Sequence, residues 1–289
     1  MSEICEKLQL NYRTIKAKRE NKHFFLSAII LFFMLSGCTP VIPDEFISRQ
    51  ETAQRQLIDH PLTYHYEESS NRSLRKVDLD NKFYYRNEAG CGSKGSQHGD
   101  RHGSAILSIH RSKDLHIKNA HLECSTQNTI YVTNSENIFL ENIAAMRGSD
   151  NALEIRDSQY VVIKDSVFSR VPANKCVETE NSIVIFYNVV LTACEKGFAG
   201  ERTSNSQPEV IFFIDSHIQV RNSDDAYAFV CDSRVRNNYG ELIITGTSTN
   251  SSNVNCPISR QIPDGLRVAI EENDIDTIRR LLEPLVSSL

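Results

Sequence analysis

Four segments between residues 108 and 190 repeat one pattern: SIHRSKDLHIKNAHL (108–122), YVTNSENIFLENIAA (131–145), EIRDSQYVVIKDSVF (154–168) and CVETENSIVIFYNVV (176–190). Each segment has an apolar stretch, a polar turn and a second apolar stretch. Two apolar positions recur at steps of 23, 23 and 22 residues: Ile109, Val132, Ile155 and Val177, and then Ile117, Leu140, Ile163 and Ile185. A period in the low twenties with alternating strands predicts stacked coils that bury their apolar faces against one another.

The same alignment stacks polar residues on neighbouring coils. Lys118, Glu141 and Lys164 form a column of alternating charge, and Arg156 is expected beneath Glu178. Opposite charges on strands about 4.8 Å apart stabilise each other modestly. Two turn positions predict side-chain ladders, which consist of Asn119, Asn142 and Asp165 at one turn and Ser112, Ser135 and Ser158 at the other.

A known fold family shows a similar pattern. The stretches YVVIKDSVF (160–168), IVIFYNVVL (183–191) and VIFFIDSHI (210–218) resemble the strand and turn of the pectate-lyase-like superfamily of right-handed parallel β-helices. Strands at Val210 and Leu242 are expected to add two coils. The prediction is an all-β protein with a parallel β-helix of about six coils over residues 101–258. Residues 38–100 are expected to form a stalk and an N-terminal cap, because solenoids cover their end strands.

The period changes near the C-terminus. PDGLRVAIEENDIDTIRRLLEPL (263–285) places apolar residues at helical spacing. The segment 259–289 resembles the helix pair of one ankyrin repeat, and a single repeat cannot bury its own apolar face. We therefore expect the pair to cap the open end of the β-helix. Contact with a partner protein, or the remnant of a truncated longer array, are the alternatives.

The segment 1–37 has the features of a bacterial export signal with a long basic leader. FFLSAIILFFML (24–35) has 12 residues, whereas a helix that spans a bilayer needs about 20. Leu35-Ser36-Gly37-Cys38 follows and resembles a lipobox, which makes Cys38 the lipidated residue. Thr39 after it resembles the pattern that directs lipoproteins to the outer membrane, facing the periplasm. An ordinary cleavable signal and a buried helix are the alternatives, and initiation at Met34 would give a cytosolic form.

Besides Cys5 in the leader and Cys38, the chain has six cysteines: Cys91, Cys124, Cys176, Cys194, Cys231 and Cys256. An even set in an oxidising compartment indicates a disulfide framework, although six cysteines allow 15 connectivities. We expect nearest neighbours to pair, as 91–124, 176–194 and 231–256. No CxxC or cysteine–histidine cluster has the spacing of metal ligands, so we predict no metal site.

The resemblance to pectate lyases implies a cluster of carboxylates that binds Ca²⁺ beside a basic residue that abstracts a proton. The candidates are the carboxylates Asp150, Asp157, Asp165, Glu178 and Glu180 and the bases Lys164, Lys175, Lys196 and Arg202. The family's Asp-His pair, however, reads Lys164-Asp165 here, and its arginine segment is replaced by VRNSDDAYAFV (220–230). Stacking accounts for most of these charges. The remaining polar groups are expected to be solvated surface residues, namely Asp224, Asp225, His110, His116 and His121.

The lack of the family's catalytic sequence favours a non-catalytic protein-binding lipoprotein, held to the membrane by its lipid. Such a protein would suit the role of an immunity protein that neutralises a secreted antibacterial toxin. One alternative is a polysaccharide lyase or epimerase that acts on a uronate polymer, which would require Ca²⁺; otherwise no cofactor is expected. Another alternative is a carbohydrate-binding module of the cell envelope. The net charge of −5 without a long charge run gives no indication of a nucleic-acid partner.

Overall fold

The computed structural model describes residues 55–57, 62–65, 74–85, 104–171, 174–203, 209–221, 226–233, 241–251, 254–256, 258–259 and 261–287. They belong to one compact unit, Ala53–Leu289. The segment 1–37, which is predicted to be an export signal, lies outside the described residues, as do Cys38, Cys91 and the Asp224-Asp225 pair. Within these ranges, no helix has the length and apolar character that crossing a membrane requires.

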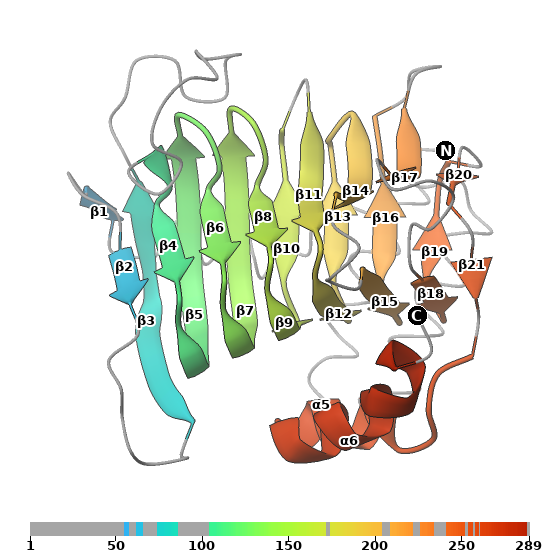
Figure 1. The fold of residues 1–289 in the computed structure, drawn as a ribbon. Coiled ribbons are helices and arrows are strands. Elements are labelled where there is room, and N and C mark those ends of the chain that lie inside the picture. The colour runs from blue at the N-terminus through green and yellow to red at the C-terminus, as the bar shows by residue number, and fades with distance from the viewer. Residues whose placement is uncertain are drawn as a thin grey trace, which may run out of the picture. The chain divides into compact units, whose positions relative to one another are not determined.

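Two parallel sheets build the body, and the chain visits them coil by coil (Figure 1). Sheet B has eight strands in the order β2 (Leu62–His65), β4 (Leu107–His110), β6 (Ile130–Thr133), β8 (Leu153–Arg156), β11 (Lys175–Glu180), β14 (Lys196–Arg202), β17 (Tyr227–Ser233) and β20 (Val254–Asn255). The predicted parallel β-helix is confirmed.

Sheet A has 13 strands and divides into two faces. Three strands run along both faces: β3 (Arg75–Tyr85), β5 (Lys113–Ser125) and β7 (Glu136–Gly148). The short β1 (Arg55–Leu57) pairs only with Phe83–Tyr85 of β3, on the side of face A2. Face A1 continues through β9 (Gln159–Lys164), β12 (Ile183–Tyr187), β15 (Val210–Ile214), β18 (Glu241–Thr245) and β21 (Ile258–Ser259). Face A2 continues through β10 (Val167–Ser169), β13 (Val190–Thr192), β16 (His217–Gln219) and β19 (Ser248–Thr249).

Within the described residues, the β-helix has more coils than the predicted six, since sheet B alone has eight strands. It also begins before residue 101, inside the segment expected to be a stalk and cap. There β2 pairs with β4, and β3 pairs with β5. These early strands continue the ladder by main-chain pairing, which does not depend on the side-chain pattern used to find the repeat.

The pairing register confirms the first two steps of 23 residues and corrects the third. Ile155 pairs with Thr179, a step of 24 residues, and not with Val177. Ile163 pairs with Phe186, a step of 23, and not with Ile185. One extra residue in the turn between β10 and β11 lengthens the step on sheet B.

One of the two predicted ladders consists of residues in the left-handed conformation. Asn119, Asn142 and Asp165 have φ angles of 60°, 54° and 51°, and the Asn142 amide donates to Asn119 Oδ1 at 2.6 Å. Asparagine and aspartate are the residues other than glycine that adopt this conformation most readily. At the other corner, Ser135 Oγ accepts from the Ser112 amide at 3.1 Å, and Ser158 Oγ accepts in the same way from Ser135.

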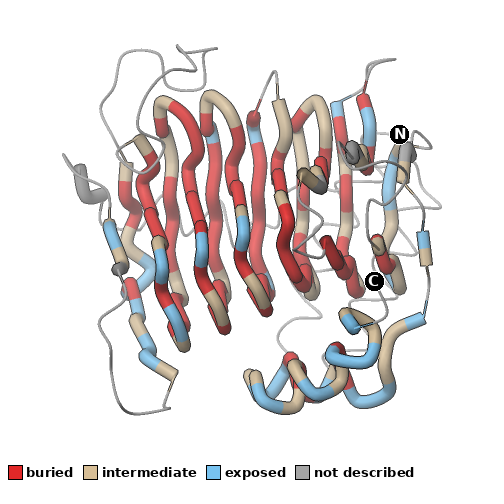
Figure 2. The backbone as a smooth tube through the Cα atoms, in the orientation of Figure 1, coloured by how far each residue is buried: buried red, intermediate tan, exposed pale blue. Residues whose placement is uncertain are grey.

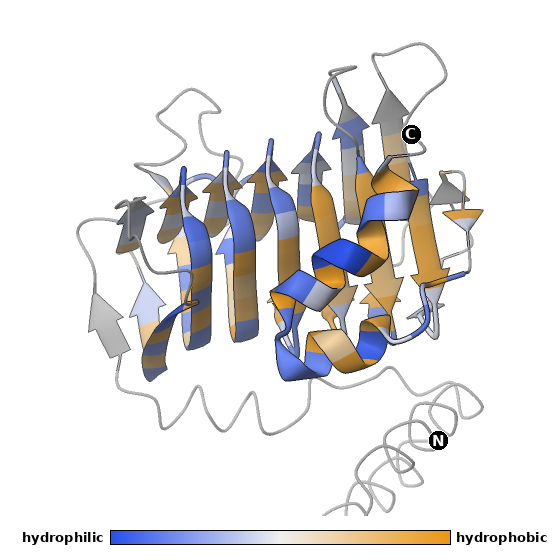
Figure 3. Ribbon diagram, turned by 60° about the horizontal axis from the view of Figure 1, so that its bottom comes forward, coloured by the Kyte–Doolittle hydropathy of each residue, from blue (hydrophilic) through white to orange (hydrophobic). Residues whose placement is uncertain are grey.

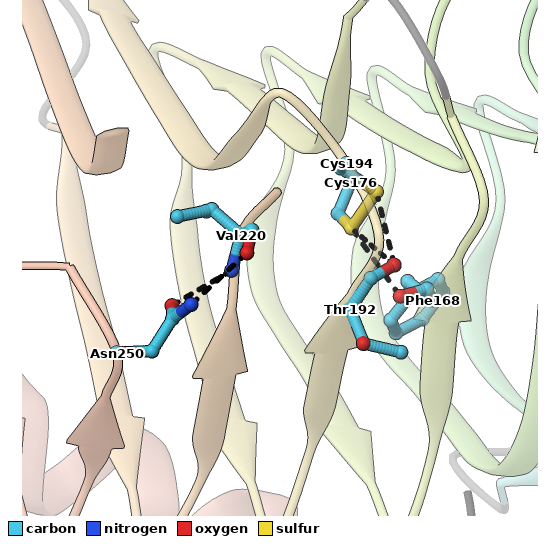
Figure 4. Close-up of a disulfide and its surroundings, with 6 residues drawn as sticks. All are labelled: Phe168, Cys176, Thr192, Cys194, Val220 and Asn250. Atoms are coloured by element: carbon cyan, nitrogen blue, oxygen red, sulfur yellow. Dashed lines mark hydrogen bonds between the residues drawn. A yellow bond between two sulfur atoms is a disulfide. The ribbon is translucent and has the colours of Figure 1, made fainter. Parts of the chain in front are cut away.

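Apolar side chains fill the interior of the stack. Figure 2 shows buried residues along the strands of successive coils. The Phe186 and Phe213 rings stack with their centroids 4.5 Å apart. The disulfide Cys176–Cys194 lies in this core, with its sulfur atoms against the main-chain oxygens of Phe168 and Thr192 (Figure 4).

The second disulfide, Cys231–Cys256, ties β17 to the residue that follows β20. Both described disulfides join nearest neighbours, as expected. Cys124 is also disulfide-bonded, whereas its expected partner Cys91 lies outside the described residues. The Asn250 side chain bonds both main-chain groups of Val220, at 2.9 and 3.0 Å, just beyond the paired strands β16 and β19 (Figure 4).

The C-terminal segment forms the predicted helix pair, α5 (Leu266–Glu272) and α6 (Ile275–Val286). The expectation that it caps the end of the β-helix is wrong, because the helices lie across the side of face A1 (Figure 3). Their buried residues are Leu266, Ala269, Ile270, Ile278 and Leu282. These pack on outward apolar residues of the strands, which include Phe139, Val162, Ile185 and Phe212. Face A1 is apolar on its outer side and therefore needs a cover.

Candidate functional site

Five charged residues gather on the outer face of sheet B, and we name them the charge cluster: Glu154 and Arg156 on β8, and Lys175, Glu178 and Glu180 on β11. In β8 the neighbours Leu153 and Ile155 belong to the interior, so the alternation of a strand turns Glu154 and Arg156 outward. The register then sets Glu154 beside Glu178 and Arg156 beside Glu180. The predicted pair of Arg156 and Glu178 is thus corrected by two residues, which is the result of the longer step.

Ion pairs connect the members of the charge cluster. The Arg156 guanidinium pairs with both Glu154 and Glu180. The Lys175 ammonium lies 2.7 Å from Glu178 Oε1. Each of the two adjacent carboxylates, Glu154 and Glu178, is thereby matched by a cation of its own.

Amides from the preceding turns complete the environment of the two adjacent carboxylates. Asn128 donates to Glu154, and Asn151 donates to Glu178 Oε2 at 2.7 Å. Glu154 is 0% exposed and Glu178 is 8% exposed. Buried carboxylates require such partners, since an unpaired buried charge costs several kcal/mol. These contacts hold each carboxylate in one orientation.

Burial and charge act in opposite directions on the pKa values of the cluster. Burial alone would lower the pKa of Arg156, but the carboxylates of Glu154 and Glu180 outweigh it and raise that pKa above its ordinary value. Burial alone would raise the pKa of Glu178, but the Lys175 ammonium and the Asn151 amide outweigh it and lower that pKa. Both groups therefore remain charged near neutral pH, and neither is poised to exchange a proton there.

The structure brings together three of the nine catalytic candidates, Lys175, Glu178 and Glu180. Lys196 lies beside Lys175 in the register. The aspartates lie in turns, where each accepts from an asparagine: Asp150 from Asn174, Asp157 from Asn181 and Asp165 from Asn188. Arg202 ends β14. Among the described residues, no group of three or more histidine, cysteine, aspartate or glutamate side chains is arranged to hold a metal ion.

Lys164 is confirmed in its charge column, and it also contacts the helix pair. Its ammonium lies 3.3 Å from Glu141 Oε1 and donates to Asn273 Oδ1 at 3.2 Å and to the Glu271 carbonyl at 3.4 Å. Asn273 is the left-handed C-cap of α5. The lysine thus supports the turn between the two helices. Its contacts with Glu141, Asn273 and Glu271 give it a structural role.

Two histidines that were expected at the surface are buried. His116 is 5% exposed, and its Nε2 lies 2.8 Å from Glu141 Oε2 on face A1, beside the ring of Phe139. His121 is 4% exposed, and its ring stacks on Phe83. His110 is partly exposed, and its Nδ1 contacts Thr133 Oγ1 at 2.8 Å.

Glu154 is the member of the charge cluster that the sequence analysis did not consider. The available signal was its position in LEIR (153–156), where a carboxylate stands between two interior residues of a strand. A glutamate at such a place faces outward beside its neighbours on the next strands, and it therefore needs a cation nearby.

A shallow polar hollow lies near the corner between sheet B and face A1. Its lining consists of Asn134, Ser135, Glu136, Asp157 and Gln159. The Glu136 carboxylate is shared between Lys113 at 3.1 Å and Arg279 of α6 at 3.0 Å. Arg279 also lies over the Tyr160 ring, 5.2 Å from its centroid. The hollow offers hydrogen-bonding groups and no apolar floor.

Comparison with known proteins gives no family. No family model matches the chain, and no curated protein matches it. One similar solved structure is a pectin methylesterase mutant in complex with a hexasaccharide, with a TM-score of 0.33 and 12% sequence identity, over 68% of this chain and 70% of that chain.

Proposed function

We propose that this protein is a non-catalytic protein-binding lipoprotein, anchored in the outer membrane through Cys38 and facing the periplasm. The anchor rests on the lipobox-like sequence that ends at Cys38, behind a short apolar run. The observation that carries the non-catalytic part is the pairing inside the charge cluster. Arg156 and Lys175 neutralise the carboxylates that a lyase would offer to Ca²⁺. A raised pKa also keeps Arg156 protonated, so that it cannot act as a base.

The form of the surface supports a macromolecular partner. Sites for small molecules are concave and largely apolar. The hollow at the corner is shallow and polar, and the outer side of sheet B presents side chains from successive coils in rows. A broad face of this kind suits another protein. An anchored periplasmic binder without catalysis fits the role of an immunity protein, which neutralises a secreted antibacterial toxin.

The test uses the mature protein with its disulfides intact and the product of the neighbouring open reading frame. We expect a stable complex on size-exclusion chromatography. We also expect no unsaturated product from polygalacturonate or alginate in the presence of Ca²⁺, followed by ultraviolet absorbance. Product formation by the wild type that is lost in Glu178→Gln would refute the proposal and favour a lyase. Repeated failure to form a complex, with the circular dichroism spectrum of a folded protein, would count against a binder.

A further inference from the structure

The outer face of sheet B changes character from one coil to the next. On β8 and β11 it carries the charge cluster, whereas the residues in register with Glu178 on β14 and β17 are Ala199 and Val230. At the start of β17, Tyr227 is 36% exposed and is one of three large apolar side chains that are exposed among the described residues. Between Lys196 and Val230 the face therefore has an apolar area with an aromatic ring, and Glu201, in register with Glu180, follows it on β14.

Lys196 lies between Lys175 and Tyr227 in the register of sheet B. The Lys175 ammonium has Glu178 as its partner at 2.7 Å. In the described part of the chain, the Lys196 ammonium has neither an ion pair nor a hydrogen bond. Like charges that face each other on neighbouring strands destabilise a sheet. Lys196 therefore contributes no ion pair at this position and has a like charge beside it in the register.

The local backbone turns Lys196 outward. A Cβ on Gly197 would lie 2.5 Å from Ile218 Cγ2, so this residue faces the crowded interior and must be glycine. Phe198 also belongs to the interior. Because these two inward residues follow each other, Lys196 before them and Ala199 after them belong to the outer face, where Ala199 is nevertheless buried. On β17 the same arrangement turns the two residues in register with them outward.

We propose that Lys196, Tyr227 and Val230, which we name the Tyr227 patch, form a docking surface for an acidic segment of a partner protein. This inference rests on the proposed protein-binding function and names where and how the partner binds. A carboxylate of the partner supplies the ion pair that Lys196 lacks and offsets its repulsion with Lys175. Tyrosine is enriched among the residues that dominate binding energy, and an apolar centre with a charged rim is the common form of an interface.

The experiment measures binding of the whole mature protein to two immobilised probes, a random copolymer of glutamate and tyrosine and, separately, polygalacturonate. The variants are Lys196→Glu and Tyr227→Ala. Lys113→Glu is the matched control, since this lysine is also partly exposed but is paired with Glu136 at 3.1 Å. We expect both patch variants to bind the copolymer at least about tenfold more weakly than the wild type, and the control to bind it normally.

Three results would overturn the patch: equal copolymer binding by all variants, no copolymer binding by the wild type, or patch-dependent binding of polygalacturonate alone, which would make it a sugar site. Failure of the patch is distinguishable from failure of the proposed function. If Lys196→Glu binds the neighbouring gene product as the wild type does, the function stands and the patch is wrong. If the wild type does not bind that product, the function fails by its own test.

A stability measurement separates a binding lysine from a structural one. Lys196→Met removes the like charge beside Lys175 and keeps the aliphatic part of the side chain. We expect its melting temperature to equal or exceed that of the wild type, while its copolymer binding weakens. A lower melting temperature would show that Lys196 stabilises the sheet, which contradicts the premise of the proposal.

Discussion

Replacing Leu282 by alanine measures how much the helix pair contributes to the stability of the β-helix. Leu282 is 0% exposed on α6, in the apolar cluster that α5 and α6 form with face A1. Truncation of a fully buried leucine costs about 2–5 kcal/mol, because transfer free energy is lost and a cavity remains. For a unit of this size, each kcal/mol changes the melting temperature by about 2–4 °C. We therefore expect a decrease on the order of 10 °C if the helices and the sheet unfold together.

The matched control is Val268→Ala on α5, whose side chain is 56% exposed. Its free energy of unfolding should change by less than about 0.5 kcal/mol. The assay is urea unfolding followed by circular dichroism, combined with hydrogen exchange of the amides in β9, β12 and β15. In Leu282→Ala we expect faster exchange in these strands, because they lose part of their cover.

Two results would refute the reasoning. One is a Leu282→Ala variant that unfolds at the same urea concentration as the wild type. The other is a separate early transition of the helices while exchange in β12 stays unchanged. The second result would show that the helix pair is an appendage and that face A1 is stable without it.

The remaining predictions concern the core, a ladder and pH. Gly197→Val should destabilise the protein by about 1–3 kcal/mol or more, because its side chain meets core atoms; an unchanged melting temperature would contradict this. Ser135→Ala should cost about 1–3 kcal/mol, because the buried Ser112 amide loses its acceptor at 3.1 Å; unaltered urea unfolding would refute it. Burial lowers the pKa of His116 below its ordinary 6.5, despite the opposing effect of Glu141, so the folded state favours the neutral ring. This contribution to stability is complete above pH 6.5 and is lost as the pH falls through the lowered pKa. In urea titrations, His116→Asn should therefore lose less free energy of unfolding than the wild type between about pH 7.5 and pH 5.5.

The sequence repeat could predict the ladders but not the full register. Apolar positions show which side of a strand is buried, and a shift by two residues keeps every side chain on its face. Val177 and Thr179 both face inward in β11, so the pattern alone could not show which of them lies beside Ile155. The extra residue in the preceding turn leaves no mark on the alternation. The same shift of two residues makes the alignment predict Glu178 beside Arg156, whereas the structure has Glu180 there.

The position of the helix pair has a signal in the sequence. VVI (161–163), IVIF (183–186) and VIFFI (210–214) are continuous apolar runs, which indicate strands buried on both sides. Such runs predict a cover over face A1, whereas an end cap would need only a few residues at the last coil. Which segment provides the cover depends on contacts across the chain, such as that of Lys164 with Asn273, 109 residues apart. A local pattern cannot specify contacts at that separation.

The charges on sheet B divide into two kinds with different consequences. Arg156 is bound by two carboxylates beside a fully buried glutamate, so its loss leaves buried negative charge and acts on stability. Lys196 has no such partner in the described chain and faces a like charge, so its loss relieves the sheet. The proposed docking of an acidic segment gives this lysine a use outside the fold. Neutralising each cation in turn therefore separates the two kinds, because Arg156→Met should unfold the protein more readily and Lys196→Met should weaken only its binding.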